Sequence, residues 1–214
     1  PLNWGLGHAT RSIPIVEKLI QSGAEVHLAG DGASLKFISE AFPTLPTHVL
    51  PSYNIEYPTG WGGAWKTVIK APNIIRSIKE EQKEIFKIIE ENKIDAIISD
   101  NRYGVYSDQI PSVFFGHQLR VLPPKLLRWG SGMILSWHQS YLKKFTEIWV
   151  PDFEKDNNLS GILSHQLSIK TPVRYIGPQS RFSNFNFSEG KKEEKIVAIL
   201  SGPEPQRTLF EQIL

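Results

Sequence analysis

The chain has 214 residues, a formal net charge of +2 at neutral pH and 21% charged residues. This balance excludes a strongly basic nucleic-acid-binding domain, and no run of about 18 apolar residues predicts a bilayer-spanning helix. The sequence has no cysteine, which excludes disulfides and thiolate metal sites and is typical of a reducing, cytoplasmic compartment.

The first half of the chain alternates helical and strand patterns. Apolar residues recur every three to four positions, as in a helix, or form short runs, as in a buried strand, with turn residues between these segments. The expected elements are a helix over 9–22, a strand over 25–29, a helix around 35–38, a strand over 48–50, a long loop over 53–65 and a long helix over 74–89.

The second half continues the alternation. We expect strands over 94–99, 111–115 and 148–150, a helix over 133–145, and a clean buried strand over 196–200. Repeated strand-helix units predict an α/β fold, a Rossmann-like parallel sheet with helices on both faces.

Composition also predicts the domain boundaries. Serine, asparagine, glycine and a lysine-glutamate cluster indicate a linker over 179–195. It separates a domain over 1–178 from the start of a second domain over 196–214. Because the chain begins with Pro1 at a turn and stops a few residues into a new helix, we expect a fragment of a longer protein.

A glycine-rich turn near the start delivers His8 to the first helix. Gly5 and Gly7 allow positive φ angles and close approach of a ligand to the backbone, and amides at a helix start favour negative groups. A histidine there is suited to moving a proton beside a bound substrate. The alternative is that the glycines only shape the turn and His8 caps the helix.

Polar residues follow two of the expected strands. Asp100 ends one strand, and His117 and Gln118 follow the next. Ligands of open α/β sheets bind outside the carboxyl ends of the strands, so these residues should converge with His8. Asp100 would then orient His8 as a base rather than a nucleophile. The alternatives are that Asp100 caps a following helix and that His117 and Gln118 satisfy loop backbone groups.

A family resemblance is carried by four stretches: Asn3-Trp4-Gly5-Leu6-Gly7-His8-Ala9-Thr10-Arg11, Ser99-Asp100-Asn101-Arg102-Tyr103-Gly104, Ile110-Pro111-Ser112-Val113 and His117-Gln118-Leu119. They resemble bacterial GT-B glycosyltransferases, in the branch related to MurG-type N-acetylglucosaminyltransferases and galactolipid synthases. The resemblance implies that the chain is the N-terminal half of a two-domain GT-B architecture, with a cleft between an acceptor-binding half and a half that binds a nucleotide sugar.

The same resemblance implies roles for individual residues. His8 is the expected base and Asp100 its partner. The expected acceptor-binding residues are Gly5, Gly7, Arg11, Asn101, Arg102, Tyr103, His117 and Gln118. In the second domain, Ser201, Gly202 and Arg207 are expected to approach the donor diphosphate, since hydroxyl, amide and guanidinium groups suit phosphate. The alternative is a rigid proline-bounded turn with Arg207 solvated.

We expect no metal site and no cofactor other than the nucleotide sugar as co-substrate, because no histidine pair has metal-ligand spacing with a carboxylate. Tryptophans and basic residues share two stretches, over 57–70 and 119–135. Such stretches suit a membrane-water interface, where they would lead a lipid-linked acceptor to the cleft of a protein peripheral to the inner face of a membrane. Equally, they are typical of loops that line an acceptor pocket.

Together with these residues, the resemblance therefore implies a glycosyltransferase of the cell envelope that moves a sugar from a nucleotide-diphosphate donor to a saccharide or lipid-linked hydroxyl, without metal. Direct displacement with inversion is favoured by a histidine-aspartate base. Two alternatives stay open: a sugar-nucleotide epimerase of the same fold, and a non-catalytic nucleotide-sugar-binding partner.

Overall fold

Helices and short strands alternate through the chain. The computed structural model describes residues 1–3, 5–53, 63–121, 131–165, 168–182, 194, 196–200 and 206–214. Its elements, in order, are α1 (Leu6–Gln21), β1 (Leu28–Gly30), α2 (Gly32–Ala41), β2 (Thr47–Val49), α3 (Gly63–Asn92), β3 (Ile97–Asp100), β4 (Ser112–Phe115), α4 (Ser131–Leu142), β5 (Glu147–Val150), the 3-10 helix η2 (Gly161–Leu163), β6 (Val173–Tyr175) and α5 (Gln206–Ile213).

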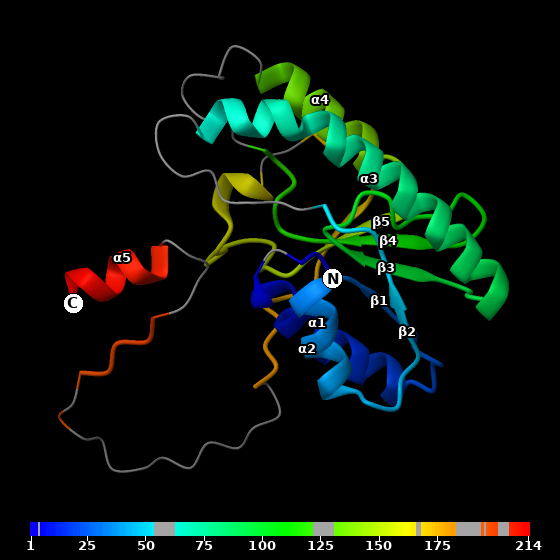
Figure 1. Cartoon of the computed structure of the whole chain (residues 1–214), viewed down its shortest axis with the longest axis horizontal. Coiled ribbons are helices and arrows are strands. Elements are labelled where there is room, and N and C mark those ends of the chain that lie inside the picture. The colour runs from blue at the N-terminus through cyan, green and yellow to red at the C-terminus, as the bar shows by residue number, and fades with distance from the viewer. Residues whose placement is uncertain are drawn as a thin grey trace.

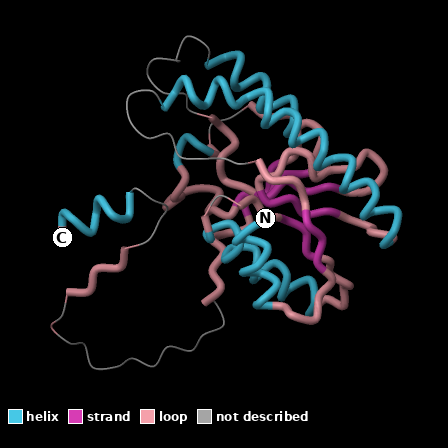
Figure 2. Tube along the Cα trace, in the orientation of Figure 1, coloured by secondary structure: helices cyan, strands magenta, loops and turns pink. Residues whose placement is uncertain are grey.

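The strands form two parallel sheets that adjoin at the N-terminal residues (Figures 1 and 2). β1 pairs with β2, and β3, β4, β5 and β6 pair in that order. Between the two sheets, the amide of Leu2 donates to the carbonyl of Asp100 at 3.1 Å. On the other side, the carbonyl of Pro1 lies close to Gly30 of β1, 3.2 Å from where a Cβ would be. This is the α/β fold with parallel strands that the sequence predicts.

Helices cover both faces of the strands, as Figure 1 shows. On one face, α1 and α2 pack on β1 through Val16, Leu28 and Ile38. On the other, α3 packs on β3 through Ile85, Ile88 and Ile97. Covering of both faces explains why β3 and β4 carry consecutive apolar residues, Ile97-Ile98 and Val113-Phe114-Phe115, instead of alternating with polar ones.

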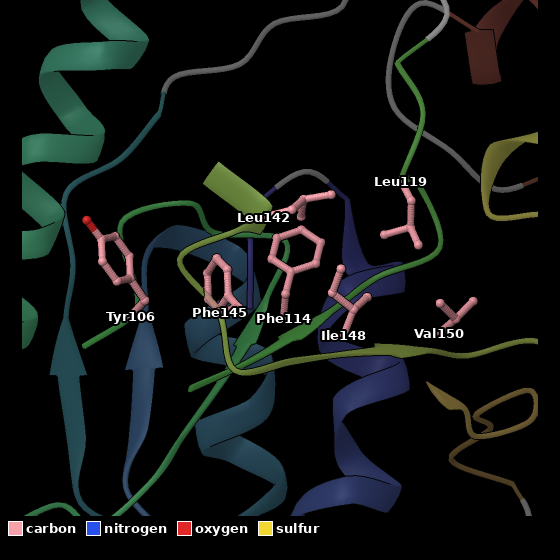
Figure 3. Packing of buried hydrophobic residues seen from close by; sticks show 7 residues of the cluster. All are labelled: Tyr106, Phe114, Leu119, Leu142, Phe145, Ile148 and Val150. Carbon is pink, nitrogen blue, oxygen red and sulfur yellow. The ribbon is translucent and has the colours of Figure 1, made fainter. Parts of the chain in front are cut away.

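The largest apolar cluster lies beside β4 and β5 (Figure 3). Phe114 of β4 is fully buried there with Leu142 at the end of α4 and Ile148 of β5. Successive side chains of a strand point to opposite faces, so the next residue, Phe115, points away from this cluster. Its ring lies under the guanidinium of Arg11 from α1, 4.9 Å from the ring centroid. β4 therefore connects the core to the helix that carries His8.

Several predicted boundaries differ from the structure. The first helix begins at Leu6 instead of residue 9, so Gly7 and His8 lie in its first turn. The sequence pattern does not predict the short strand β6. Most of the predicted loop over 53–65 and most of the predicted linker lie outside the described residues, and α3 already begins at Gly63.

The predicted buried strand over 196–200 is wrong for this structure. These residues form no strand, and the side chains of Ile196, Val197 and Ile199 are largely exposed. A strand needs a neighbour to pair with its backbone, and within the described ranges none lies beside this segment. The segment has the apolar composition of a buried strand, but no described sheet lies beside it.

The described helices include none that is long and apolar enough to cross a membrane.

Candidate functional site

His8 and Asp100, 92 positions apart in the sequence, meet at the carboxyl end of β3. Nδ1 of His8 lies 2.7 Å from Oδ1 of Asp100. The approach is set by Gly5, whose φ of +79° turns the chain into α1, and by β3, which ends on Asp100. The structure thus brings together the two residues whose convergence the sequence predicts.

The carboxylate of Asp100 is buried and receives hydrogen bonds on both oxygens. Arg11 donates through Nη2 to Oδ1 and through Nε to Oδ2, the latter at 3.1 Å. Ser12 Oγ lies 3.0 Å from Oδ2 and 2.9 Å from the carbonyl of His8, and its single proton serves one of the two. Burial alone would raise the pKa of Asp100. The hydrogen bond from His8 and the charge and hydrogen bonds of Arg11 outweigh it and hold that pKa well below the ordinary value.

An ionised Asp100 decides the tautomer of His8. A carboxylate only accepts hydrogen bonds, so a contact of 2.7 Å with Nδ1 requires the proton on Nδ1. The lone pair of the neutral ring is then on Nε2. Within the described part of the chain, Nε2 of His8 has no hydrogen-bond partner, and the side chain is 14% exposed. This arrangement is that of a general base oriented by a carboxylate.

Arg11 extends the site to the end of β4. Its Nη1 lies 3.1 Å from Nδ1 of His117, while the same guanidinium holds Asp100 and stacks on Phe115. Burial lowers the pKa of His117, and the charges of Arg11 and His8 lower it further. His117 is exposed at the rim and Gln118 is half-buried beside it. Both are placed at the edge where the sequence reading expects them.

Asn101 shapes the turn that follows β3. It has a positive φ of 57°, and its backbone N–H donates a hydrogen bond to the carbonyl of Phe115 at 3.1 Å. Asparagine tolerates this left-handed conformation better than most residues. Its side chain lies near Gly116, where an added Cβ would come 3.5 Å from Oδ1 of Asn101. Asn101 is 8% exposed, so it supports the edge of the sheet more than it faces solvent.

Two residues expected to bind acceptor pack toward the protein interior, with Arg102 buried and Tyr103 partly buried. Arg102 is 2% exposed, and its three nitrogens donate to Glu81, Asp31 and the carbonyl of Pro51. A guanidinium committed to these buried partners has no face left for a ligand, so the structure makes Arg102 a structural residue and contradicts its predicted acceptor contact.

Tyr103 packs inside the fold as well. Its hydroxyl lies 3.0 Å from Nδ1 of the buried His138, and its ring stacks on Phe114 at 5.8 Å. Burial raises the pKa of Tyr103 well above its usual range. Its contacts are those of the core, and its predicted acceptor contact is not supported by this placement.

Two residues that hold the site in place are not predicted from the sequence. Ser12 Oγ lies within hydrogen-bond distance of the carboxylate of Asp100. The ring of Phe115 packs against the guanidinium of Arg11. Ser12 could have been found from helix geometry, since residues 8 and 12 are four apart and share a face. The position of Phe115 needs the parallel register that pairs it with Asp100, which no local pattern contains.

Other predicted site residues cannot be placed in this site. Ser201 and Gly202 lie outside the described residues, and Arg207 is exposed on α5. The two aromatic-basic stretches also lie largely outside the described part or have only their backbone described. Among the residues that the structure describes, no group of three or more histidine, aspartate or glutamate side chains could hold a metal ion.

The comparisons with known proteins give one result. Residues 3–108, the stretch that contains Gly5, His8, Arg11 and Asp100, match the family model described as glycosyl transferase family 1. No curated protein and no solved structure is significantly similar to the chain.

Proposed function

We propose, from the premise that residues 3–108 are a glycosyl transferase family 1 domain, that this protein transfers a sugar from a nucleotide-diphosphate donor to a hydroxyl of an acceptor. The observation that carries the proposal is the 2.7 Å contact between Nδ1 of His8 and the buried carboxylate of Asp100. The matched segment contains both residues, and the carboxyl edge of a parallel sheet is where open α/β folds bind ligands.

In the proposed reaction, Nε2 of His8 removes the proton from the acceptor hydroxyl. The hydroxyl oxygen forms its bond to the anomeric carbon of the donor while the bond from that carbon to the diphosphate oxygen breaks. The electron pair leaves with the nucleoside diphosphate, and the ionised Asp100 stabilises the imidazolium that forms. Direct displacement of this kind inverts the anomeric centre.

Residues around the dyad would bind the substrates. Arg11, His117 and Gln118 line the same edge and are suited to an acceptor that is a saccharide or a lipid-linked hydroxyl compound. Ser201, Gly202 and Arg207 would hold the donor diphosphate through hydroxyl, amide and guanidinium donors, without a metal. The resemblance noted above favours a role in building the cell envelope.

The test begins with the donor. Uridine, guanosine and thymidine diphosphates are screened against the full-length protein by thermal shift, because a ligand that binds only the folded form raises its melting temperature. Sugar nucleotides of the base that binds are then assayed for release of nucleoside diphosphate with saccharide and lipid acceptors.

With an active pair in hand, His8→Gln is compared with the wild type. We expect kcat to fall by about 10²–10⁴, the range of a lost general base, with donor affinity nearly unchanged. His27→Gln is the matched control, because it replaces a histidine just before β1 that does not contact the site, and it should keep full activity.

Three results would contradict the proposal. Equal kcat for His8→Gln and wild type would remove His8 as the base. Tight nucleotide binding without turnover on any acceptor would indicate a binding protein. Conversion of the donor sugar to its epimer, with no transfer, would indicate an epimerase.

A further inference from the structure

Arg11 contacts both histidines at the carboxyl edge of the sheet. Its Nη2 lies 2.9 Å from Nδ1 of His8, and its Nη1 lies 3.1 Å from Nδ1 of His117. The guanidinium is held in place by Asp100 below and by the ring of Phe115 on one face. One rigid cation therefore faces the same nitrogen on two different imidazoles.

The two contacts have different chemistry because of what lies beside each ring. A guanidinium has only donors, so Nδ1 of His117 must offer a lone pair to form a hydrogen bond at 3.1 Å. The proton of the neutral His117 ring is then on Nε2. A doubly protonated His117 could not accept from Arg11 at all.

His8 has the reverse pattern. Its Nδ1 faces Oδ1 of Asp100 at 2.7 Å, and two bare acceptors would repel at that distance. The proton is therefore on Nδ1, and Arg11 Nη2 donates to the same carboxylate oxygen instead of to the ring. Asp100, itself fixed by Arg11, keeps Nε2 of His8 as the acceptor.

We propose that Arg11 is a positioning residue that fixes opposite tautomers of His8 and His117, so that the site presents one imidazole nitrogen as a proton acceptor and another as a hydrogen-bond donor. The donor is Nε2–H of His117, at the exposed rim. The assignment of its ligand rests on the proposed function: this Nε2–H binds a second oxygen of the acceptor substrate. That oxygen accepts the hydrogen bond through a lone pair, while the reacting hydroxyl loses its proton to His8.

The tautomers are measured directly, with no substrate present. Long-range proton-nitrogen correlation spectra of the full-length protein, labelled with ¹⁵N, distinguish a protonated from a bare nitrogen in each ring. His8→Gln and His117→Gln identify the two sets of signals. We expect Nδ1 protonated and Nε2 bare in His8, and the opposite in His117.

Arg11→Met tests whether the arginine is the cause. The nitrogen signal of Nδ1 in His117 should lose its hydrogen-bonded shift, and His117 should titrate at a higher pH, because the neighbouring positive charge is gone. Lys18→Met removes an equal charge from an exposed position on the same helix and should change neither signal. If Arg11→Met does not fold, Arg11→Lys replaces it. A single ammonium keeps the charge but cannot reach Asp100 and His117 together, so Nδ1 of His117 should again lose its hydrogen-bonded shift.

The same tautomer in both rings of the wild type would overturn the proposal, as would an unchanged His117 signal in a folded Arg11 variant. An unchanged His117 signal, or a proton on Nδ1 in both rings, leaves His8 as a base oriented by Asp100, so the proposed function would stand. A bare Nδ1 in His8 would contradict the proposed function as well.

The role of the donor has its own kinetic readout. His117→Ala should raise KM for the acceptor with little loss of kcat, whereas His8→Gln lowers kcat. A lowered kcat at unchanged KM for His117→Ala would contradict binding of a substrate oxygen while leaving the tautomers as measured. If the wild type transferred no sugar to any acceptor, the proposed function would be wrong, while the tautomers measured by the spectra would stand.

Discussion

At the scale of single residues, the two glycines beside His8 have different reasons to be glycine. Gly5 has a φ of +79° and a ψ of 161°, a conformation that costs an L-residue with a Cβ about 1–3 kcal/mol. Gly7 lies in the first turn of α1 with no positive φ, and an added Cβ there would meet nothing within 4 Å. Backbone geometry therefore requires glycine at the first position only.

Alanine substitutions separate these reasons. Gly5→Ala should lower the free energy of unfolding by about 1–3 kcal/mol, because a φ of +79° with a ψ of 161° is a backbone conformation that essentially only glycine adopts. Gly7→Ala should raise it by about 0.5–1 kcal/mol, since alanine loses less entropy in a helix. Urea unfolding measures both. If Gly7 serves close approach of a ligand, Gly7→Ala should also raise KM although the protein is more stable, and equal losses of stability in both variants would contradict this division.

The meeting of His8 with Asp100 could be predicted from the sequence because both follow from topology. A helix that starts at a glycine turn and a strand that ends at an aspartate lead to the same edge of a parallel sheet. The burial of Arg102 could not be predicted in this way. Its partners Glu81 and Asp31 come from distant segments, and nothing local distinguishes an arginine at a rim from one beneath it.

At the scale of elements, β1 and β2 carry a pair of stacked histidines. His27, just before β1, lies with its Nδ1 3.0 Å from Nε2 of His48 in β2, and the ring centroids are 5.3 Å apart. Burial lowers the pKa of His48 below the ordinary 6.5, and the neighbouring His27 lowers it further. The folded state therefore binds a proton here less readily than the unfolded chain does.

The sign of the pH effect follows from that lowered pKa. The contribution of His48 to stability is present above about pH 6.5 and is lost as the pH falls toward the folded pKa, because the unfolded chain takes up the proton first. His48→Gln keeps a hydrogen-bonding side chain and removes the titration. Unfolding in urea at several pH values should show a smaller loss of stability in acid than for the wild type.

His27→Gln removes the other member of the pair and should flatten the same part of the curve. Identical pH profiles for wild type and both variants would show that the pair does not control acid stability. Lys36→Gln, an exposed change on α2, checks that any difference is not a general effect of surface substitution.

Most elements could be predicted because their apolar residues repeat over several turns or alternate with clear turn residues. The long α3 is the plainest case, with Ile78, Ile85 and Ile88 buried on one side. β6 was missed because three residues with partly exposed side chains give almost no pattern. The segment over 196–200 shows the reverse failure, since a strong apolar pattern is not sufficient without a neighbouring strand.

At the scale of the whole molecule, a buried polar network joins the elements that hold the site. Arg102, directly after Asp100 and Asn101, donates to Asp31 at the end of β1 and to Glu81 of α3. Tyr53 also donates to Glu81, and the amide of Gly104 donates to it at 2.9 Å. The network fixes the turn after β3 between the two sheets and α3.

Arg102 and the buried carboxylates that it binds should be energetically coupled. Arg102→Met leaves buried carboxylates without their cation and should lower the free energy of unfolding by about 3–5 kcal/mol. The double variant Arg102→Met with Glu81→Gln should lose less than the sum of the two single variants, because one unpaired charge is gone as well. Urea unfolding of all four proteins gives the cycle.

Additive losses would contradict coupling through the buried charges. Arg76→Met and Glu80→Gln form a control cycle on the exposed face of α3, where the Nε of Arg76 lies 2.8 Å from Glu80. Exposed pairs contribute about 0–1 kcal/mol, so that cycle should be close to flat.

The two adjoining phenylalanines of β4 make the length of this strand matter more than its exact composition. Phe114 fills the interior next to Ile148 while Phe115 underlies Arg11. Because successive side chains of a strand face opposite sides, deleting Val113 would move Phe115 into the place of Phe114 and Gly116 into the place of Phe115. The guanidinium of Arg11 would then lose the ring that supports it. A change in strand length far from His8 in the sequence would thus disable the site although His8, Arg11 and Asp100 are all unchanged.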